Sequence, residues 1–248
     1  QPGSQQLAEA ISKAGGTPVQ APMLEIQPYA DPAGMRELHA KFSSYAGVIF
    51  ISPNAVKHGL PVVRRLGLGQ KTLFAIGHGT RQSIVDSLVD DASVTLKMPL
   101  KVFNSEGLLD LEEFNANTVT GKRFLIMRGN GGREYLADTL KQRGASVDYL
   151  ATYERIPTEK SLASVLQEHQ VENPAIGVIT SVEGLQILAK KISTEGLQRL
   201  FQMPLVVAGS RIAHELENHG FTNPPLIADN PSQENIIARL MRWVVEKI

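Results

Sequence analysis

The sequence contains no cysteine, which excludes disulfide bonds, a thiolate nucleophile and cysteine-ligated metals. It also has no long apolar run: the longest candidate, Gly47–Ile51, has the length of a strand and falls far short of the roughly 20 residues that span a bilayer. Neither charge sign is in excess, because Lys plus Arg and Asp plus Glu both total 25. Nucleic-acid-binding proteins usually show a basic excess. We therefore expect a cytoplasmic protein that binds neither nucleic acid nor membranes.

Several motifs for metals, nucleotides and covalent catalysis are missing as well. His214 and His219 lie five residues apart without the glutamate of a zinc-binding helix, and the remaining histidines show no metal-ligand spacing either. No Gly-x-Ser-x-Gly motif surrounds Ser52 or Ser181, which argues against covalent serine chemistry. The glycine cluster Gly129–Gly132 has neither the dinucleotide-binding nor the P-loop spacing. We expect no metal and no cofactor.

Short, β-branched apolar runs that alternate with helical patterns fill most of the chain. Two clear amphipathic stretches are Glu134–Arg143 and Val182–Lys191. Continuous apolar strands separated by helices are typical of parallel sheets covered on both faces, so the sequence predicts the α/β class. The expected strands are Val48–Ile51, Leu73–Ile76, Val94–Leu96, Phe124–Met127, Val147–Leu150, Val178–Thr180, Leu205–Ala208 and Leu226–Ala228.

The chain also resembles itself, which indicates an internal duplication. Ser52 ends an apolar run that matches the run ending at Ser181, at an offset of 129 residues. Gly77 matches Gly209 at an offset of 132 residues, and each unit ends with an acidic, apolar helix after a proline-containing loop. A chain of 248 residues accommodates two such units of about 120 residues, an ordinary domain size.

The duplication leads to one expectation about the N-terminus. The strand Phe124–Met127 precedes the loop that begins at Arg128, whereas the matching segment Gln1–Gly3 has nothing before it in the sequence. By symmetry we expect a further strand upstream of Gln1.

The polar candidates lie where predicted strands run into predicted helices. In open α/β sheets, ligands bind at the carboxyl ends of the strands. Glycines allow tight turns there, and the free N–H groups at a helix start attract anions. The candidate binding residues are Ser52, Asn54, His78, Thr80, Arg81, Arg128, Gly129, Asn130, Arg133, Ser181, Ser210 and Arg211.

Most of these candidates also have a purely structural interpretation. Ser52 and Ser181 can be helix N-caps, and Asn54 can be a turn residue. His78 has the ordinary pKa range of an acid–base group, yet the second unit has Ser210 in its place. That replacement favours a loop-capping or exposed histidine.

The arginines and one tyrosine are more informative as a group than singly. Each arginine alone is typical of a solvated surface charge, whereas four of them at strand ends suit a ligand with several carboxylates. Tyr153 lies just beyond the predicted strand Val147–Leu150. Alone it is typical of a packed aromatic at a strand end, and its position at the crossing between units makes it a candidate donor.

In their order and spacing, these motifs resemble the uroporphyrinogen-III synthase family. No single piece is diagnostic, but together they extend over almost the whole chain. The matching pieces are Pro2–Gly15, Phe50–Val56, Ile76–Gly77 with Thr80, Arg128–Asn130 with Arg133, Gly144 with Tyr153, Thr180–Ser181, and Gly209 with Ala213.

The resemblance implies two similar flavodoxin-like α/β domains with parallel sheets, joined by two extended linkers. The chain would start in the first domain, cross to the second and return. On this sequence the first domain would comprise residues 1–27 and 158–248, and the second residues 33–153. The linkers would lie near Gln27–Pro32 and Tyr153–Pro157.

The resemblance also implies the cyclising dehydration of hydroxymethylbilane to uroporphyrinogen III, with inversion of ring D and without a cofactor. Ser52, Thr80 and Ser181 would line the cleft, and backbone amides around Gly129 and Asn130 would hold substrate carboxylates. Tyr153 matches the tyrosine proposed to help the hydroxyl leave. Where a threonine is usual in the second unit, this chain has Ile212.

We further expect a monomer that makes a transient contact with hydroxymethylbilane synthase. The alternative from another class is a non-catalytic two-domain binding protein for a small anionic ligand. Such receptors share the clamp architecture but are ordinarily exported.

Overall fold

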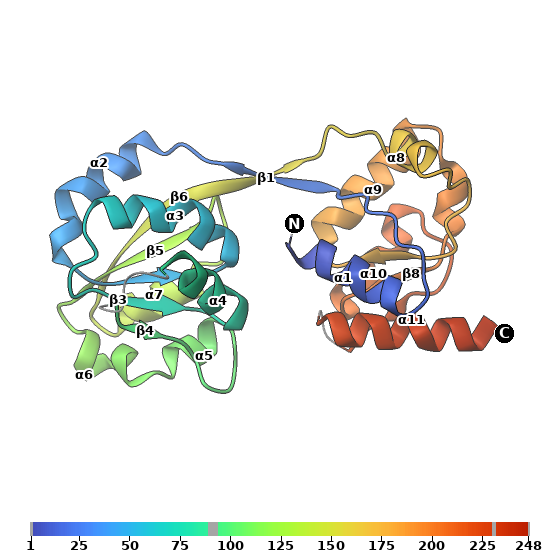
Figure 1. The fold of residues 1–248 in the computed structure, drawn as a ribbon. Coiled ribbons are helices and arrows are strands. Elements are labelled where there is room, and N and C mark those ends of the chain that lie inside the picture. The colour runs from blue at the N-terminus through green and yellow to red at the C-terminus, as the bar shows by residue number, and fades with distance from the viewer. Residues whose placement is uncertain (1, 89–93, 230–231, 248) are drawn as a thin grey trace. The chain divides into compact units, whose positions relative to one another are not determined.

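The computed structural model describes residues 2–88, 94–229 and 232–247. The chain forms two compact units (Figure 1). Unit 1 comprises Gln1–Glu25 and Ile156–Ile248, and unit 2 comprises Ile26–Arg155. Each unit has its own sheet, one with the strand order β1-β6-β5-β2-β3-β4 and one with the order β7-β8-β9.

The six-stranded sheet belongs mainly to unit 2. The four adjacent pairs from β6 to β4 are all parallel, as continuous apolar strands separated by helices predict. Its strands are β1 (Leu24–Pro28), β2 (Tyr45–Phe50), β3 (Thr72–Ala75), β4 (Leu96–Lys97), β5 (Arg123–Gly129) and β6 (Ser146–Pro157).

Helices cover both faces of this sheet, and alternate residues of each strand face opposite cores. On β2, Val48 and Phe50 pack in one core, whereas Ile49 packs in the other. The first core includes residues of α2 (Pro32–Lys41), α3 (Pro53–Arg65) and α4 (His78–Ser87). The second includes residues of α5 (Ser105–Leu109), α6 (Ala116–Val119) and α7 (Tyr135–Gln142).

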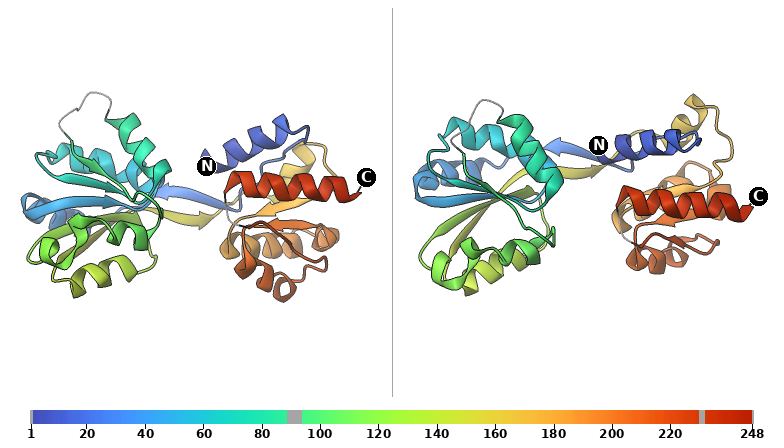
Figure 2. Two further views of the ribbon diagram at one scale, coloured as in Figure 1. Left: turned by 90° about the horizontal axis from the view of Figure 1, so that it is seen from below. Right: turned by 60° about the horizontal axis from the view of Figure 1, so that its bottom comes forward.

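The three-stranded sheet of unit 1 is also parallel and covered on both faces. Its strands are β7 (Gly177–Ile179), β8 (Leu205–Val207) and β9 (Leu226–Ile227). Helices α1 (Pro2–Lys13) and α11 (Gln233–Lys247) lie side by side on one face (Figures 1 and 2). The other core includes residues of α8 (Leu162–Glu168), α9 (Val182–Thr194) and α10 (Ser210–Glu215).

The predicted α/β class is confirmed, and a strand forms at each of the eight predicted positions. The run expected at Val94–Leu96 forms its strand slightly later, at Leu96–Lys97, where β3 offers partners. The amphipathic stretches expected at Glu134–Arg143 and Val182–Lys191 are helices α7 and α9. Across the described ranges, no helix is long and apolar enough to cross a membrane.

Strand extends into both segments expected as extended linkers: it includes residues 27–28 of Gln27–Pro32 and all of Tyr153–Pro157. Residues 24–28 form β1, and residues 153–157 form the end of β6, its neighbour in the sheet. The amide of Tyr29 donates to the carbonyl of Thr152, and the amide of Thr158 donates to that of Met23, so β1 runs antiparallel to β6. Their pairing has no local signature in the sequence, because the two segments lie more than 120 residues apart.

Candidate active site

The carboxyl ends of β5 and β2 meet at the point where the strand order of unit 2 reverses. From β2 the chain proceeds through β3 to β4 in one direction, and from β5 it proceeds to β6 in the other. Ligands of open α/β sheets bind at such a reversal, outside the carboxyl ends of the strands. Ser52 follows β2, and Gly129 ends β5. The structure therefore brings these two candidate residues to the same edge.

Ser52 is the N-cap of the 13-residue helix α3. Its Oγ accepts a hydrogen bond of 3.0 Å from the amide of Ala55, as the structural interpretation of this serine requires. The same Oγ lies 3.0 Å from the hydroxyl oxygen of Tyr153, in a second hydrogen bond. Asn54 is the second residue of α3 and is half-buried. Ser52 thus combines a capping role with a contact to the predicted catalytic tyrosine.

Tyr153 lies on β6 directly beside Gly129 of β5, and only 2% of its surface is exposed. Its carbonyl accepts a hydrogen bond of 2.7 Å from the amide of Asn130. Its ring occupies the space that a side chain at position 129 would need, because a Cβ built on Gly129 would lie 2.8 Å from Cε2 and Cζ of the ring. Ser52, Gly129, Asn130 and Tyr153, which the sequence suggests one by one, therefore form a single packed cluster.

Arg128 is held by two neighbours rather than left free. Its guanidinium lies 3.6 Å from the centroid of the Tyr149 ring and donates a hydrogen bond of 2.8 Å to Glu134. The hydroxyl of Tyr149 and the guanidinium of Arg128 lower the pKa of the Glu134 carboxyl below its ordinary value. Arg133, by contrast, is exposed. The two arginines of this loop therefore differ in how readily they can bind a ligand.

The loop after β3 carries the next group of candidates. His78 is the first residue of α4, is exposed, and lies with its ring 4.2 Å from the ring of Phe103. Thr80 is buried, whereas Arg81 is exposed. Of these three candidates, His78 and Arg81 have accessible side chains.

The remaining candidates lie in unit 1 and form a group of their own. Ser181 is the N-cap of α9, and its Oγ accepts a hydrogen bond of 3.0 Å from the amide of Gly184. Ser210 and Arg211 are exposed in the first turn of α10, whereas Ile212 is buried. Ile212 corresponds to Thr80 at the offset of 132 residues, and both side chains point into their cores.

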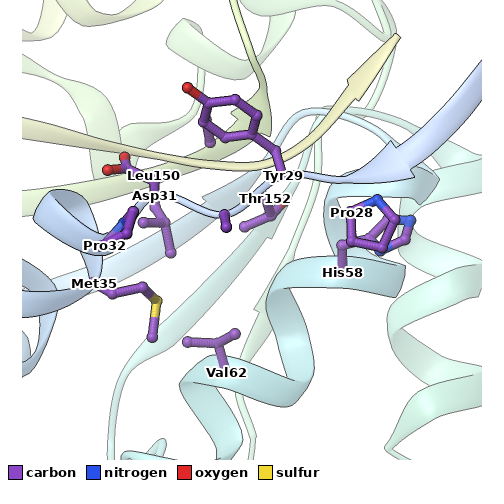
Figure 3. A pocket seen from close by; sticks show the side chains of 11 residues that line it. Pro28, Tyr29, Asp31, Pro32, Met35, His58, Val62, Leu150 and Thr152 are labelled. Atoms are coloured by element: carbon purple, nitrogen blue, oxygen red, sulfur yellow. The ribbon is translucent and has the colours of Figure 1, made fainter. Parts of the chain in front are cut away.

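A pocket of about 340 Å³ lies next to the cluster around Tyr153, on the α2 and α3 side of the six-stranded sheet (Figure 3). Its wall includes His58 and Val62 from α3, Met35 from α2 and Thr152 from β6. The His58 ring centroid is 6.1 Å from that of Tyr153, and burial, with a smaller contribution from Lys57, lowers the pKa of His58. The sequence reasoning gave this histidine no role, although its spacing of four from the apolar Val62 indicates the same helix face.

Metal ligation finds no support among the residues that the structure describes. No three His, Asp or Glu side chains among them lie close enough to hold an ion. The donors that gather at the strand ends are hydroxyls, arginines and backbone amides, which bind carboxylates and other anions.

An α/β sheet whose order reverses at an edge lined by such donors defines a protein that binds or transforms an anionic small molecule. The family model of uroporphyrinogen-III synthase HemD matches residues 5–238, and the chain belongs to this family. It is accordingly an enzyme of tetrapyrrole biosynthesis.

Individual relatives agree with the family. The chain is 33% identical to the uroporphyrinogen-III synthase of Proteus mirabilis, in an alignment covering 62% of this chain and 76% of the relative. It is 32% identical to the enzyme of that name from Salmonella typhimurium, over 67% of this chain and 65% of the relative. The Escherichia coli protein is 34% identical, over 55% of this chain and 54% of its own length.

Two solved structures share the fold at low sequence identity. Uroporphyrinogen-III synthetase from Helicobacter pylori matches with a TM-score of 0.59 and 17% identity, covering 89% of this chain and 91% of that protein. A mutant uroporphyrinogen III synthase from Thermus thermophilus matches with a TM-score of 0.55 and 13% identity, covering 99% and 96%.

Proposed function

We propose that this chain converts hydroxymethylbilane into uroporphyrinogen III by cyclising dehydration with inversion of ring D. The observation that carries the proposal is the family match across residues 5–238. The donors at the strand ends suit the substrate, a flexible linear tetrapyrrole with eight carboxylates, as the resemblance implies.

In this reaction the main task of the protein is to hold its substrate in one conformation. Loss of the terminal hydroxyl gives an electrophilic azafulvene, and attack by the substituted carbon of the last ring gives a spiro intermediate that reopens and recloses with that ring inverted. Spontaneous closure gives the uninverted isomer instead. Holding the chain so that the substituted carbon attacks is therefore the central task, because correct orientation alone supplies a large part of many rate enhancements.

For the substrate-binding groups we propose the accessible donors at the strand ends. Arg81, Arg133 and Arg211 are exposed, and a planar guanidinium matches a carboxylate in two parallel hydrogen bonds. Arg128 joins them when a substrate carboxylate displaces Glu134. The loop that follows Asn130 offers backbone amides near Arg128 and Arg133 in the sequence.

The remaining predicted site residues take two kinds of role in this proposal. His78 and Ser210 are exposed at their strand ends, and Ser181 caps α9 in unit 1. Asn54 and Thr80 pack in the first turns of α3 and α4 and shape these helix starts, because the first is half-buried and the second is buried. For Tyr153 we keep the proposal that it assists departure of the substrate hydroxyl.

We also propose that the chain has two flavodoxin-like domains, residues 1–27 with 158–248 and residues 33–153. The compact units support this division. The order β6-β5-β2-β3-β4 supports the flavodoxin-like fold of the second domain, because it is the flavodoxin order 2-1-3-4-5 when β5 and β6 are counted first. A cytoplasmic location, a monomeric state and a contact with hydroxymethylbilane synthase stay predictions. Light scattering on the purified chain tests the monomeric state.

The decisive experiment gives the purified chain freshly generated hydroxymethylbilane and separates the product isomers by chromatography after oxidation. We expect isomer III in excess over the isomer I of spontaneous closure. Folded protein that yields isomer I alone would overturn the proposal. Binding of the bilane without turnover would favour the alternative, a non-catalytic receptor for anionic ligands.

A further inference from the structure

The hydroxyl groups of Ser52 and Tyr153 form a pair whose members differ in access. Their oxygens are 3.0 Å apart, although the two residues are 101 positions apart in the sequence. Tyr153 is 2% exposed and belongs to the apolar core of unit 2, whereas Ser52 is half-buried at the start of α3. A substrate at the strand ends would therefore meet Ser52 before it met Tyr153.

The hydrogen bonds of Ser52 determine whether its hydroxyl can donate to a further group. A serine hydroxyl has two lone pairs and one hydrogen. One lone pair accepts the amide of Ala55. When the phenol of Tyr153 donates to the second lone pair, the hydrogen of Ser52 is left to donate to a third group. The N-terminus of a 13-residue helix lies at the same place, and its partial positive charge favours an oxygen that develops negative charge.

Two backbone features hold the tyrosine in the position that this pairing needs. The amide of Asn130 donates to the carbonyl of Tyr153 at 2.7 Å, across the irregular end of the β5–β6 ladder. Gly129 leaves the space that the ring fills. The phenol is thus fixed from the backbone side, and Ser52 is its hydrogen-bond partner.

We propose that Ser52 is the catalytic residue that contacts the departing hydroxyl of the substrate, and that Tyr153 is a positioning residue that acts through Ser52. This inference rests on the proposed function and revises the role of the tyrosine in it. It also revises the role of Gly129, which makes room for the tyrosine ring rather than holding a carboxylate.

The C–O bond of the terminal CH₂OH group breaks with its electron pair on oxygen, and the pyrrole nitrogen supplies the pair for the new exocyclic double bond. The departing oxygen takes a proton from Ser52, which takes one from Tyr153. The N–H proton of the resulting azafulvenium cation passes to Ser52, which returns a proton to the phenolate. The products are the neutral azafulvene and water.

The experiment separates the hydroxyl of Ser52 from its capping role. Asparagine caps helices about as well as serine but carries no hydroxyl, whereas threonine keeps both functions. We expect Ser52→Asn to lower kcat by about tenfold to hundredfold with little change in KM or Tm. One general acid or base typically contributes about a hundredfold or more to the rate. Ser52→Thr should stay within about threefold of the wild-type kcat, since the hydroxyl is retained.

A double-mutant cycle then tests whether the tyrosine acts through the serine. Tyr153→Phe should lower kcat in the wild-type background and have no further effect on kcat in the Ser52→Asn background. Two losses that multiply, or a Ser52→Asn variant with wild-type kcat, would overturn the inference. If asparagine lowers Tm, Ser52→Gly, which is also an accepted N-cap without a hydroxyl, gives the same comparison.

Asn104 provides a matched control for exchanging caps. It is the N-cap of α5, where its side chain accepts a hydrogen bond of 2.9 Å from the amide of Gly107. Asn104→Ser makes the reverse exchange and should leave kcat and Tm at wild-type values. Failure of the inference is distinguishable from failure of the proposed function, because the wild-type chain must first produce isomer III.

Discussion

Gly129→Ala is a sensitive test of the cluster at the strand ends. Gly129 has no side chain, and the ring of Tyr153 fills the space beside it. An added Cβ would lie 2.8 Å from two ring carbons, closer than Cβ atoms are found in proteins, and a tight 3.2 Å from the hydroxyl oxygen. The ring is buried, and the carbonyl of Tyr153 accepts a hydrogen bond from the amide of Asn130. Moving the tyrosine aside therefore costs free energy. The methyl group must therefore displace the ring or the strand.

The expected loss of folding stability follows from the cost of overpacking in other protein cores. One inserted methyl group in a packed core costs about 1–3 kcal/mol. For domains near this size, each kcal/mol shifts Tm by about 2–4 °C, so we expect a fall of about 2–12 °C. We also expect kcat to fall, because displacement of the ring breaks the hydrogen bond of the phenol to Ser52. Calorimetry gives the first quantity, and turnover of fresh hydroxymethylbilane gives the second.

Gly79→Ala is the matched control for stability. Gly79 lies in α4, and an added Cβ would meet only Cγ of Pro53, at an ordinary contact distance of 3.7 Å. Alanine should leave stability unchanged or raise it by up to about 1 kcal/mol, since it is the better helix former. A Gly129→Ala variant with wild-type Tm would refute the packing argument. A variant with reduced Tm and wild-type kcat would show that the position of the tyrosine does not matter for turnover.

Three further predictions concern charge. Glu134→Gln should lower KM about twofold, because it frees Arg128 from an exposed ion pair of modest strength; an unchanged or raised KM in steady-state assays would contradict this. Burial opposes ionisation of Asp148, yet Arg123 and Tyr45 prevail and lower its pKa, so its stabilising effect is present above about pH 4 and lost as the pH falls further. Urea titrations should thus show Asp148→Asn to be less stable by about 1 kcal/mol at pH 6, with the difference shrinking toward pH 3. Finally, raising the ionic strength from 0.05 to about 0.5 M should raise KM several-fold with little change in kcat, because arginine–carboxylate attraction is screened.

Local patterns in the sequence were enough for the elements themselves. Ser52 and Ser181 could be recognised as candidate N-caps because a capping side chain bonds an amide only three residues away. The strands were recognisable because both faces of a parallel sheet are buried, which leaves continuous apolar runs. The offset between the two halves was likewise visible directly, and it correctly aligns α3 with α9.

The partners of the site residues were not recognisable in this way, because they depend on contacts between distant parts of the chain. The hydrogen bond of Ser52 to Tyr153 and the packing of that ring on Gly129 follow from the order β6-β5-β2, which brings together strands that begin about 100 residues apart. The same holds for β1, whose pairing with β6 has no local signature. Sequence periodicity records which face of an element is apolar, whereas the identity of the neighbour is a property of the folded sheet. For this reason the tyrosine that the sequence offers as a candidate general acid is buried in the structure, and its hydroxyl is hydrogen-bonded to a half-buried serine.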